Sequence, residues 1–332
     1  MRLTNTTLIA AGLTLMTVPA YAQDNVLTVY TYDSFNSDWG PGPGVEFAFE
    51  EICDCDLQFT STGDGAALLA RLRLEGARSD ADVVLGLDTN LMTAAIEADL
   101  MAEHRLTPDG LTLPMDWDDR YFLPYDWGFF AFVHRASMEN VPSSFEALAA
   151  SETSIVIQDP RSSTPGLGLL MWVQHAYGER AGAIWEGLAD NVVTVTPGWS
   201  EAYGLFLDGE ADMVLSYTTS PAYHLIAEED DSYDSALFDE GHYMQVEVGG
   251  VLQTADNPEL AEMFLAFMMS PAFQEVIPMT NWMYPAAAIE VEELPEGFQT
   301  LTQPEDALIF FPDEAAAIRD EALATWQNAL GQ

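Results

Sequence analysis

Apolar runs alternate with segments of helical periodicity through most of the chain. Each apolar run is four to eight residues long, and each segment between two runs repeats its apolar residues at the spacing of one helix face. Strands are predicted at 26–32, 56–62, 81–88, 154–159, 191–198 and 211–217, and helices at 44–52, 66–76, 90–100, 167–178 and 200–209. Such alternation predicts an α/β fold with parallel, doubly wound sheets and helices on both faces.

Two further apolar strands, 127–135 and 243–252, do not fit the alternation. We interpret them as the two passages by which the chain crosses between lobes. Lobe one then combines residues 23–126 with part of 244–332, and lobe two spans 127–243. A division into two consecutive domains is the alternative, which periodicity alone leaves open.

The N-terminus has the pattern of a secretory signal peptide. One Arg precedes an apolar run too short to span a bilayer, and small residues stand at Ala20 and Ala22. A buried N-terminal helix is the alternative, but no acidic residue occurs before Asp24. Removal of residues 1–22 leaves about 310 residues, which exceeds the usual size of one core and favours two domains. We expect export to the periplasm.

The charge balance narrows the range of partners. The chain has 10 Lys+Arg residues, all of them Arg, against 54 Asp+Glu. Nucleic acid and anionic membranes are therefore unsuitable partners, because too few cations are present to neutralise phosphates. The acids are scattered and 48% of residues are hydrophobic, which indicates a folded protein with a solvated acidic surface rather than a disordered tail.

Motifs of known enzyme chemistry are missing from the sequence. It has no nucleophile elbow, P-loop, zinc-protease motif or dinucleotide fingerprint, and its five His residues have no metal-binding spacing. Cys53 and Cys55 lie where a helix is predicted to run into a strand. A disulfide between them and two unpaired structural thiols are both open, and a catalytic thiol is the least favoured interpretation.

Polar residues follow several of the predicted strands. In doubly wound sheets, ligands bind beyond the carboxyl ends of the strands, facing helix starts. One predicted rim carries Asp64, Gly65 and Asp88, and the facing rim carries Ser163, Thr164, Trp199, Ser200, Thr218, Thr219 and Ser220. Ordinary helix capping accounts for the same residues, so capping and ligand binding both stay open at these positions.

Aromatic residues stand in the loops near these rims. Tyr32 and Trp39 lie in a loop rich in Gly and Pro, and Trp282 follows a long amphipathic segment. Together with Asp64 and Trp199 they outline a box of aromatic faces and a carboxylate, which suits a flat cation. A desolvated cation over a ring contributes about 0.5–2 kcal/mol.

The order of these stretches resembles a known family. The motifs are TVYTYDSF, DWGPGP, ADVVLGLD, DPRSSTPGLGLLMW, TPGWSEAYGLFL, VLSYTTSPAYH, EGHYMQVEV and NWMYP. In this order they are similar to the thiamine-binding periplasmic proteins of ABC-type vitamin B1 importers, over almost the whole mature chain. The resemblance implies a two-lobed type II periplasmic-binding-protein fold, with a mostly parallel sheet in each lobe and a ligand cleft between the lobes.

The resemblance also implies a ligand and a set of contacts. The ligand is thiamine, its monophosphate or its diphosphate, delivered to an inner-membrane permease by a monomer that needs no cofactor or metal and has no catalytic residue. Asp64 is expected to accept from the aminopyrimidine amine, and the hydroxyl groups near Ser163 and Thr218 to hold the hydroxyethyl or phosphate end. The implied contacts are Asp64, Gly65, Ser163, Thr164, Trp199, Tyr217, Thr218, Thr219, Ser220, Tyr32, Trp39, Tyr223 and Trp282.

Other ligands and one enzyme remain as alternatives. Relatives of this fold bind polyamines, oxyanions or ferric ion, and ferric ion would favour adjacent tyrosines, which the sequence lacks. Polyamines suit carboxylates with aromatics and stay open. Thiamine-degrading enzymes share a similar fold but attack with a cleft cysteine, whereas Cys53 and Cys55 are predicted to lie away from the rims.

Overall fold

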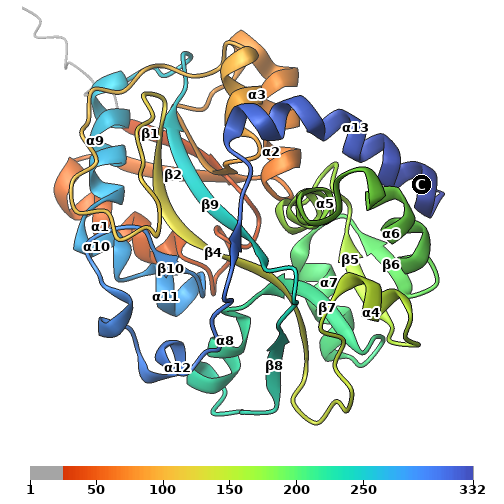
Figure 1. Ribbon diagram of the computed structural model, residues 1–332. Coiled ribbons are helices and arrows are strands. Elements are labelled where there is room, and N and C mark those ends of the chain that lie inside the picture. Colours follow the sequence, from red (N-terminus) through yellow and green to blue (C-terminus); the bar gives the residue numbers. More distant parts are fainter. Residues whose placement is uncertain (1–24, 332) are drawn as a thin grey trace, which may run out of the picture.

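The computed structural model describes residues 25–331, so the signal peptide predicted for residues 1–22 lies outside the described part of the chain. Two lobes lie side by side, each with helices on both faces of its sheet (Figure 1). Two long strands, β4 (Phe122–Arg135) and β9 (His242–Val251), run through the middle of the molecule.

The first lobe is built around β1, which pairs in parallel with β2 and β3. Leu27 and Val29 contribute to the core under α1 and α9, whereas Tyr30 contributes to the core under α2 and α3, as the two-residue period of a strand requires. The bounds are β1 Val26–Thr31, β2 Asp56–Ser61, β3 Val83–Asp88, α1 Gly42–Cys53, α2 Gly65–Glu75, α3 Met92–Glu97 and α9 Pro258–Met268. The strands and helices predicted for this part of the chain are confirmed, with ends shifted by a few residues.

The second lobe repeats the arrangement around β5, which pairs in parallel with β6 and β7. Strand β8 pairs antiparallel with the far end of β4. The bounds are β5 Ile155–Gln158, β6 Val192–Thr196, β7 Met213–Tyr217, β8 Tyr233–Ala236, α4 Phe145–Ala149, α5 Thr164–Tyr177, α6 Ala181–Leu188, α7 Trp199–Leu207 and α8 Ser220–Ala227. In both lobes the helices that follow a strand begin at the same edge of the sheet, which positions the site.

Strand β4 belongs to both lobes. Its first half, from Phe122 to Phe129, pairs antiparallel with β9, and its second half, from Phe130 to His134, pairs antiparallel with β7. The strand path is therefore continuous, in the order β2-β1-β3-β9-β4-β7-β5-β6. The segments 127–135 and 243–252 fall within or next to β4 and β9; the lobe boundaries proposed around them stay a prediction.

After β9 the chain completes the first lobe and then returns to the second. The C-terminal helix α13 packs against α5 and α6, also contacts α3, and buries Trp326. Figure 1 shows α13 running across the top of both lobes. The remaining bounds are α10 Pro271–Gln274, α11 Ile277–Thr280, β10 Tyr284–Pro285, α12 Glu296–Gln299, β11 Ala307–Leu308 and α13 Pro312–Leu330.

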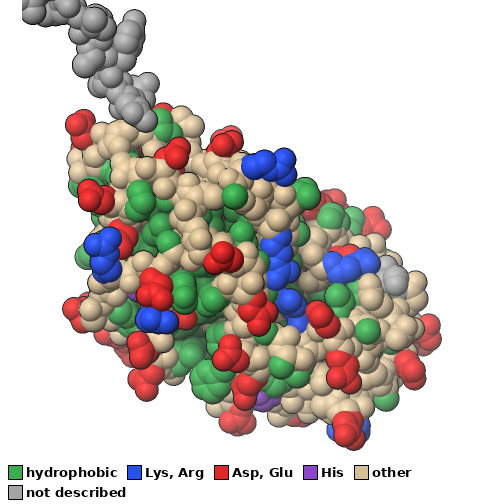
Figure 2. Space-filling view, turned by 90° about the horizontal axis from the view of Figure 1, so that it is seen from above, with side chains coloured by type: hydrophobic (Ala, Val, Ile, Leu, Met, Phe, Trp, Pro, Cys, Tyr) green, Lys and Arg blue, Asp and Glu red, His purple; other side chains and the backbone are tan. Residues whose placement is uncertain are grey.

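Cys53 and Cys55 form a disulfide where α1 ends and β2 begins, which decides between the alternatives left open by the sequence. Acidic side chains are scattered over the face seen in Figure 2. Within residues 25–331, no single helix is long and apolar enough to cross a membrane; one bent pair, Pro258–Met268 with Pro271–Thr280, passes by length and composition alone.

Candidate functional site

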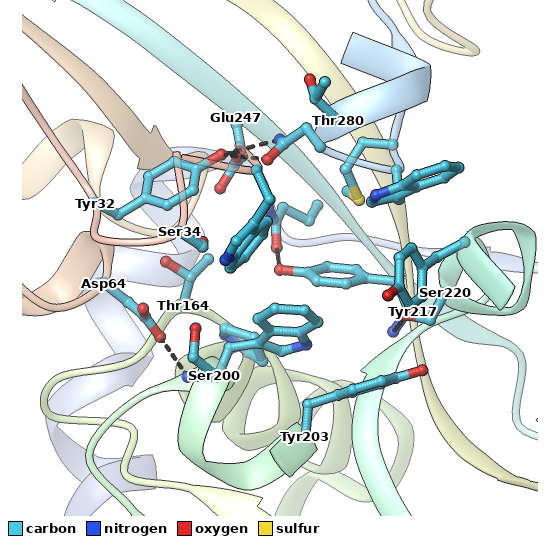
Figure 3. A pocket seen from close by; sticks show the side chains of 18 of the residues that line it. Tyr32, Ser34, Asp64, Thr164, Ser200, Tyr203, Tyr217, Ser220, Glu247 and Thr280 are labelled. Carbon is cyan, nitrogen blue, oxygen red and sulfur yellow. Dashed lines mark hydrogen bonds between the residues drawn. The ribbon is translucent and has the colours of Figure 1, made fainter. Parts of the chain in front are cut away.

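A cavity of about 580 Å³ lies between the lobes, where both sets of helices begin (Figure 3). Its volume is within the range of small-molecule sites, about 300–1,000 Å³. Most of the contacts predicted from the sequence line it: Tyr32, Trp39, Asp64, Thr164, Trp199, Tyr217, Ser220, Tyr223 and Trp282. Residues far apart in the sequence are thus brought together by the strand ends of both lobes.

The other predicted contacts lie behind the wall of this cavity. Thr218 and Thr219 are fully buried, and the Thr219 hydroxyl points to the Met283 sulfur at 3.7 Å. Gly65 and Ser163 take part in contacts between the lobes and are not part of the lining. Their roles as direct ligand contacts stay predictions.

Asp64 joins the two lobes across one end of the cavity. It stands just before α2, yet its side chain makes no capping bond to that helix. Instead its Oδ2 accepts from the Ser163 hydroxyl at 2.7 Å and from the Trp199 backbone N–H at 3.1 Å. Oδ1 has no hydrogen-bond donor among the described residues. Asp64 therefore closes the cleft with one oxygen and keeps the other as an acceptor at the cavity wall.

The environment of Asp64 also changes its acidity. Burial raises the pKa of Asp64 to about 6, because the charged form loses water, and the bonds from Ser163 and Trp199 offset part of that rise. Beside it, the Gly65 N–H donates to the Thr164 hydroxyl at 3.1 Å. Asp64 and Gly65 stand at the start of α2 in one lobe, and Ser163 and Thr164 at the start of α5 in the other, so these contacts require the lobes to lie close together.

The starts of several helices face the cavity. Thr164 begins α5, Trp199 begins α7 and Ser220 begins α8, and all three line it. The first N–H groups of a helix have no partner within the helix, and they carry the positive end of its dipole. The helix starts thus favour an anionic or hydroxyl group, although the described part of the chain places no basic side chain in the lining.

Aromatic rings form one wall. Trp199 stacks on Tyr203 with ring centroids 5.0 Å apart, and its indole N–H donates to the Ser216 hydroxyl at 2.8 Å. Trp39, from the loop after β1, lies 6.4 Å from Trp199 and is 55% exposed. The indole of Trp199 is therefore held in place from behind, whereas Trp39 lines the cavity with more than half of its side chain open to solvent.

A second wall comes from the loop after α11. Trp282 packs edge-on against Tyr223 at 5.3 Å. Its backbone has φ +58°, in the left-handed region that non-glycine residues seldom adopt. Such conformations cost about 1–3 kcal/mol and concentrate at functional sites. The loop therefore presents this indole to the cavity at an energetic cost to the fold.

The floor of the cavity was missed by the sequence reasoning. Gln245 and Glu247 of β9 both line it, because they lie two residues apart on one face of the strand. The Tyr217 hydroxyl donates to the Gln245 Oε1 at 2.8 Å, while the buried Gln245 Nε2 has no partner among the described residues. A buried, unpaired donor is costly and implies a ligand acceptor or a water at this point.

Tyr32 reaches the same floor because of a glycine opposite it. Its hydroxyl donates to the Glu247 Oε2 at 2.8 Å. Gly86 has φ +104°, and a Cβ at this position would lie 2.2 Å from the Tyr32 ring. The ring can therefore reach Glu247 only while residue 86 has no side chain.

Among the described residues that line the cavity, the only ionised side chains are carboxylates. Arg161, two residues before Ser163, is paired with Asp159 and lies over the Trp326 ring. Among the described residues, no cluster of His, Cys, Asp and Glu could hold a metal ion. Aromatic faces with Asp64 and Glu247 and no opposing cation are suited to a flat, positively charged ligand.

Known proteins match both the sequence and the structure. Residues 48–278 match the family described as bacterial extracellular solute-binding protein. The chain is 52% identical over 323 residues to the thiamine-binding periplasmic protein of Escherichia coli (strain K12), covering 96% of this chain and 98% of that protein. It is 47% identical over 317 residues to the thiamine-binding periplasmic protein of Brucella suis biovar 1 (strain 1330), covering 95% of each.

A solved structure of a periplasmic thiamin binding protein superimposes with a TM-score of 0.90 at 51% identity, covering 94% of this chain and 98% of that one. The type II periplasmic-binding-protein fold and the periplasmic localisation expected from the sequence are confirmed. The chain belongs to the bacterial extracellular solute-binding proteins, in the group of the thiamine-binding periplasmic proteins.

Proposed function

We propose that this protein captures thiamine in the periplasm and delivers it to an inner-membrane ABC permease. The lining of the cavity carries the proposal: aromatic faces, the carboxylates of Asp64 and Glu247, and no basic side chain. Thiamine is a permanent cation with two flat rings, so it gains from stacking and from negative charge nearby. The thiamine-binding relatives at 47–52% identity support the same ligand.

Each part of thiamine has a matching group in the cavity. The free oxygen of Asp64 accepts from the aminopyrimidine amine, as the sequence analysis expected. Trp199 and Trp39 provide the faces for the thiazolium, and the Gln245 Nε2 provides a donor to a ring nitrogen. These assignments also explain why one oxygen of Asp64 and one nitrogen of Gln245 lack partners within the described chain.

Thiamine monophosphate and diphosphate are proposed as further ligands. Their phosphates would lie at the helix starts of α5, α7 and α8, where the positive ends of the helix dipoles favour anions. Because no Lys or Arg lines the cavity, each added phosphate charge gains less than it would beside a guanidinium. We therefore expect affinity to fall from thiamine to the diphosphate.

The remaining roles are proposed on the same basis. The protein acts as a monomer without a cofactor and performs no catalysis. The thiol chemistry of a thiamine-degrading enzyme has no counterpart here, because Cys53 and Cys55 are bonded to each other at the end of α1 and neither lines the cavity. Incubation with thiamine and a nucleophilic amine is expected to give no turnover, and any catalytic product would contradict this role.

Isothermal titration calorimetry with thiamine, its two phosphates and spermidine tests the ligand. Thiamine is expected to bind one-to-one, and spermidine at least about a hundredfold more weakly, a difference of about 2.7 kcal/mol. Spermidine lacks the flat rings that the aromatic walls need. Tighter binding of spermidine than of thiamine would instead favour the polyamine-binding alternative, and no heat with thiamine would exclude the proposal.

A further inference from the structure

Two buried carboxyl groups lie side by side at the floor of the cavity. Glu247 of β9 stands directly opposite Asp126 of β4 in the antiparallel ladder. The ladder has an irregularity between Pro124 and Asp126, a type of feature that redirects side chains and is frequent beside binding sites. Asp126 is fully buried and Glu247 is 5% exposed, and only Glu247 lines the cavity.

The hydrogen bonds around this pair leave a place for one proton. The Glu247 Oε2 accepts from the hydroxyls of Tyr32 and Tyr125, at 2.8 and 2.7 Å. The Asp126 Oδ2 accepts from the Asn281 amide at 2.6 Å, while its buried Oδ1 has no donor among the described residues. The two carboxyl groups stand opposite each other in the ladder, and both are buried. A proton on Asp126 would let its unpaired oxygen act as a donor, whereas two ionised carboxylates can only accept.

No positive charge offsets the pair. Among the described residues, none of the ion pairs involves Asp126 or Glu247. The titratable groups that face the pair are acids and phenols: Tyr32 after β1, Asp64 before α2, Asp88 at the end of β3, Tyr125 of β4 and Tyr217 of β7. Burial and like charge both disfavour a second negative charge in such surroundings.

We propose that Asp126 stays protonated and donates a hydrogen bond to Glu247. The pair then carries a single negative charge, which acts as the counter-charge of the bound thiazolium. Asp126 is thus a positioning residue that acts through Glu247. The proposal rests on thiamine being the ligand. Glu247 carries the charge because two hydroxyls donate to it, whereas Asp126 has one amide donor.

The acidities agree with this division. Burial raises the pKa of Glu247 to about 6, and donors from Tyr125, Tyr32 and Asp126 offset part of that rise. Burial and the neighbouring Glu247 charge raise the pKa of Asp126 well above its usual range. Both directions agree with a negative charge on Glu247 and a proton on Asp126.

Infrared spectroscopy of the ligand-free protein tests the shared proton directly. At pH 7.5 we expect a C=O stretching band of a protonated carboxyl group that is absent from Asp126→Asn. If the wild type has no band that this substitution removes, the proposal is wrong. This measurement needs no ligand, so its outcome is separate from that of the proposed function.

Calorimetric titrations with thiamine between pH 5 and 8 test the link to binding. Asp126→Leu removes the proton donor and is expected to move the acid midpoint of affinity upward by roughly one pH unit, the effect of one charge-assisted hydrogen bond. Asp126→Asn, which still donates, is expected to restore it toward the wild-type value. Identical midpoints for the wild type and Asp126→Leu would overturn the proposal. Absence of thiamine binding by the wild type at pH 8 would instead count against the proposed function.

Discussion

The two oxygens of the Asp64 carboxylate have different roles. Oδ2 holds the lobes together through Ser163 and the Trp199 N–H, and Oδ1 is left for the ligand. A residue that caps its own helix could not do this, and α2 indeed has no side-chain cap. The motif around Asp64 allowed the position to be predicted, but not the contact across the cleft.

Substitution of Asp64 by Asn is expected to weaken thiamine binding at least tenfold, or about 1.4 kcal/mol, because the amide keeps the shape and loses the charge. Calorimetric titration at pH 8 measures the change. Glu201→Gln removes the same charge from the first turn of α7, outside the cavity lining, and serves as the matched control with affinity within twofold of the wild type. Equal effects of the two substitutions would show that only net charge matters.

Trp199 is expected to contribute through its ring face. Trp199→Ala should weaken thiamine binding at least tenfold, because it removes the ring on which the ligand stacks. It also leaves Tyr203 without its stacking partner. Trp199→Phe keeps a ring but loses the bond to Ser216, so a loss of less than about threefold is expected. Quenching of intrinsic fluorescence by thiamine measures both. An alanine variant with wild-type affinity would remove Trp199 from the site.

Gln245 and Glu247 show why part of the site could not be predicted. In the sequence they alternate with apolar residues, which is the pattern of a strand with one solvated face. The structure buries every residue of β9, so these two polar side chains face an internal cavity instead. Only the fold could have indicated this, because a strand that crosses between the lobes is buried on both faces.

At the scale of elements, periodicity identified the long strands and the helices α1, α2, α3, α5 and α7. It gave no range for α6 and α13, and it missed α4 and the run of α10, α11 and α12, which are four or five residues long. A single helical turn shows no period, and such turns are fixed by tertiary contacts rather than by local preference. The loop that carries Trp282 follows α11, so its place at the cavity depended on elements without a sequence pattern.

The packing of α5 on β4 provides a test at this scale. A Cβ at Gly168 would lie 2.0 Å from the Phe130 ring, so Gly168→Ala must displace either the helix or the ring. We expect a loss of stability on the order of 1–3 kcal/mol by denaturant titration. Gly204→Ala in α7 meets nothing within 4 Å and should stabilise by up to about 1 kcal/mol. A Gly168→Ala variant as stable as the wild type would contradict this packing.

At the scale of the whole molecule, buried acids dominate the pH dependence of stability. Burial raises the pKa of Asp64 and Glu247 to about 6 and that of Asp88 to about 7, from ordinary values of 3.8 to 4.5. Between these limits the folded state binds more protons than the unfolded state. The stability that these three buried acids add to the folded state is therefore fully present below pH 4, and it is lost as pH rises through 6 to 7.

The melting temperature is accordingly expected to rise as pH falls from 8 to 5. A shift of roughly 2 pKa units corresponds to about 3 kcal/mol for each fully buried group. Differential scanning calorimetry of the ligand-free protein measures the trend, and Asp88→Asn should make it shallower. A melting temperature that falls steadily from pH 8 to pH 5 would contradict these assignments.

Ionic strength acts on the same molecule through its surface. With a formal net charge of -44, the folded protein repels itself, and salt shortens the range of that repulsion from about 10 Å at 0.1 M to about 3 Å at 1 M. We expect added NaCl to raise the melting temperature at pH 8. No change between low and high salt would indicate that the scattered acids are too far apart to matter.

The C-terminal helix has a consequence for how the cleft opens. Bodies joined only by β4 and β9 could twist as well as bend about these strands. Because α13 also rests on α3 of one lobe and on α5 and α6 of the other, it ties them together at a further point. Twisting would strain this contact more than bending would. We therefore expect the cleft to close on a ligand by bending about β4 and β9, with little rotation of one lobe against the other.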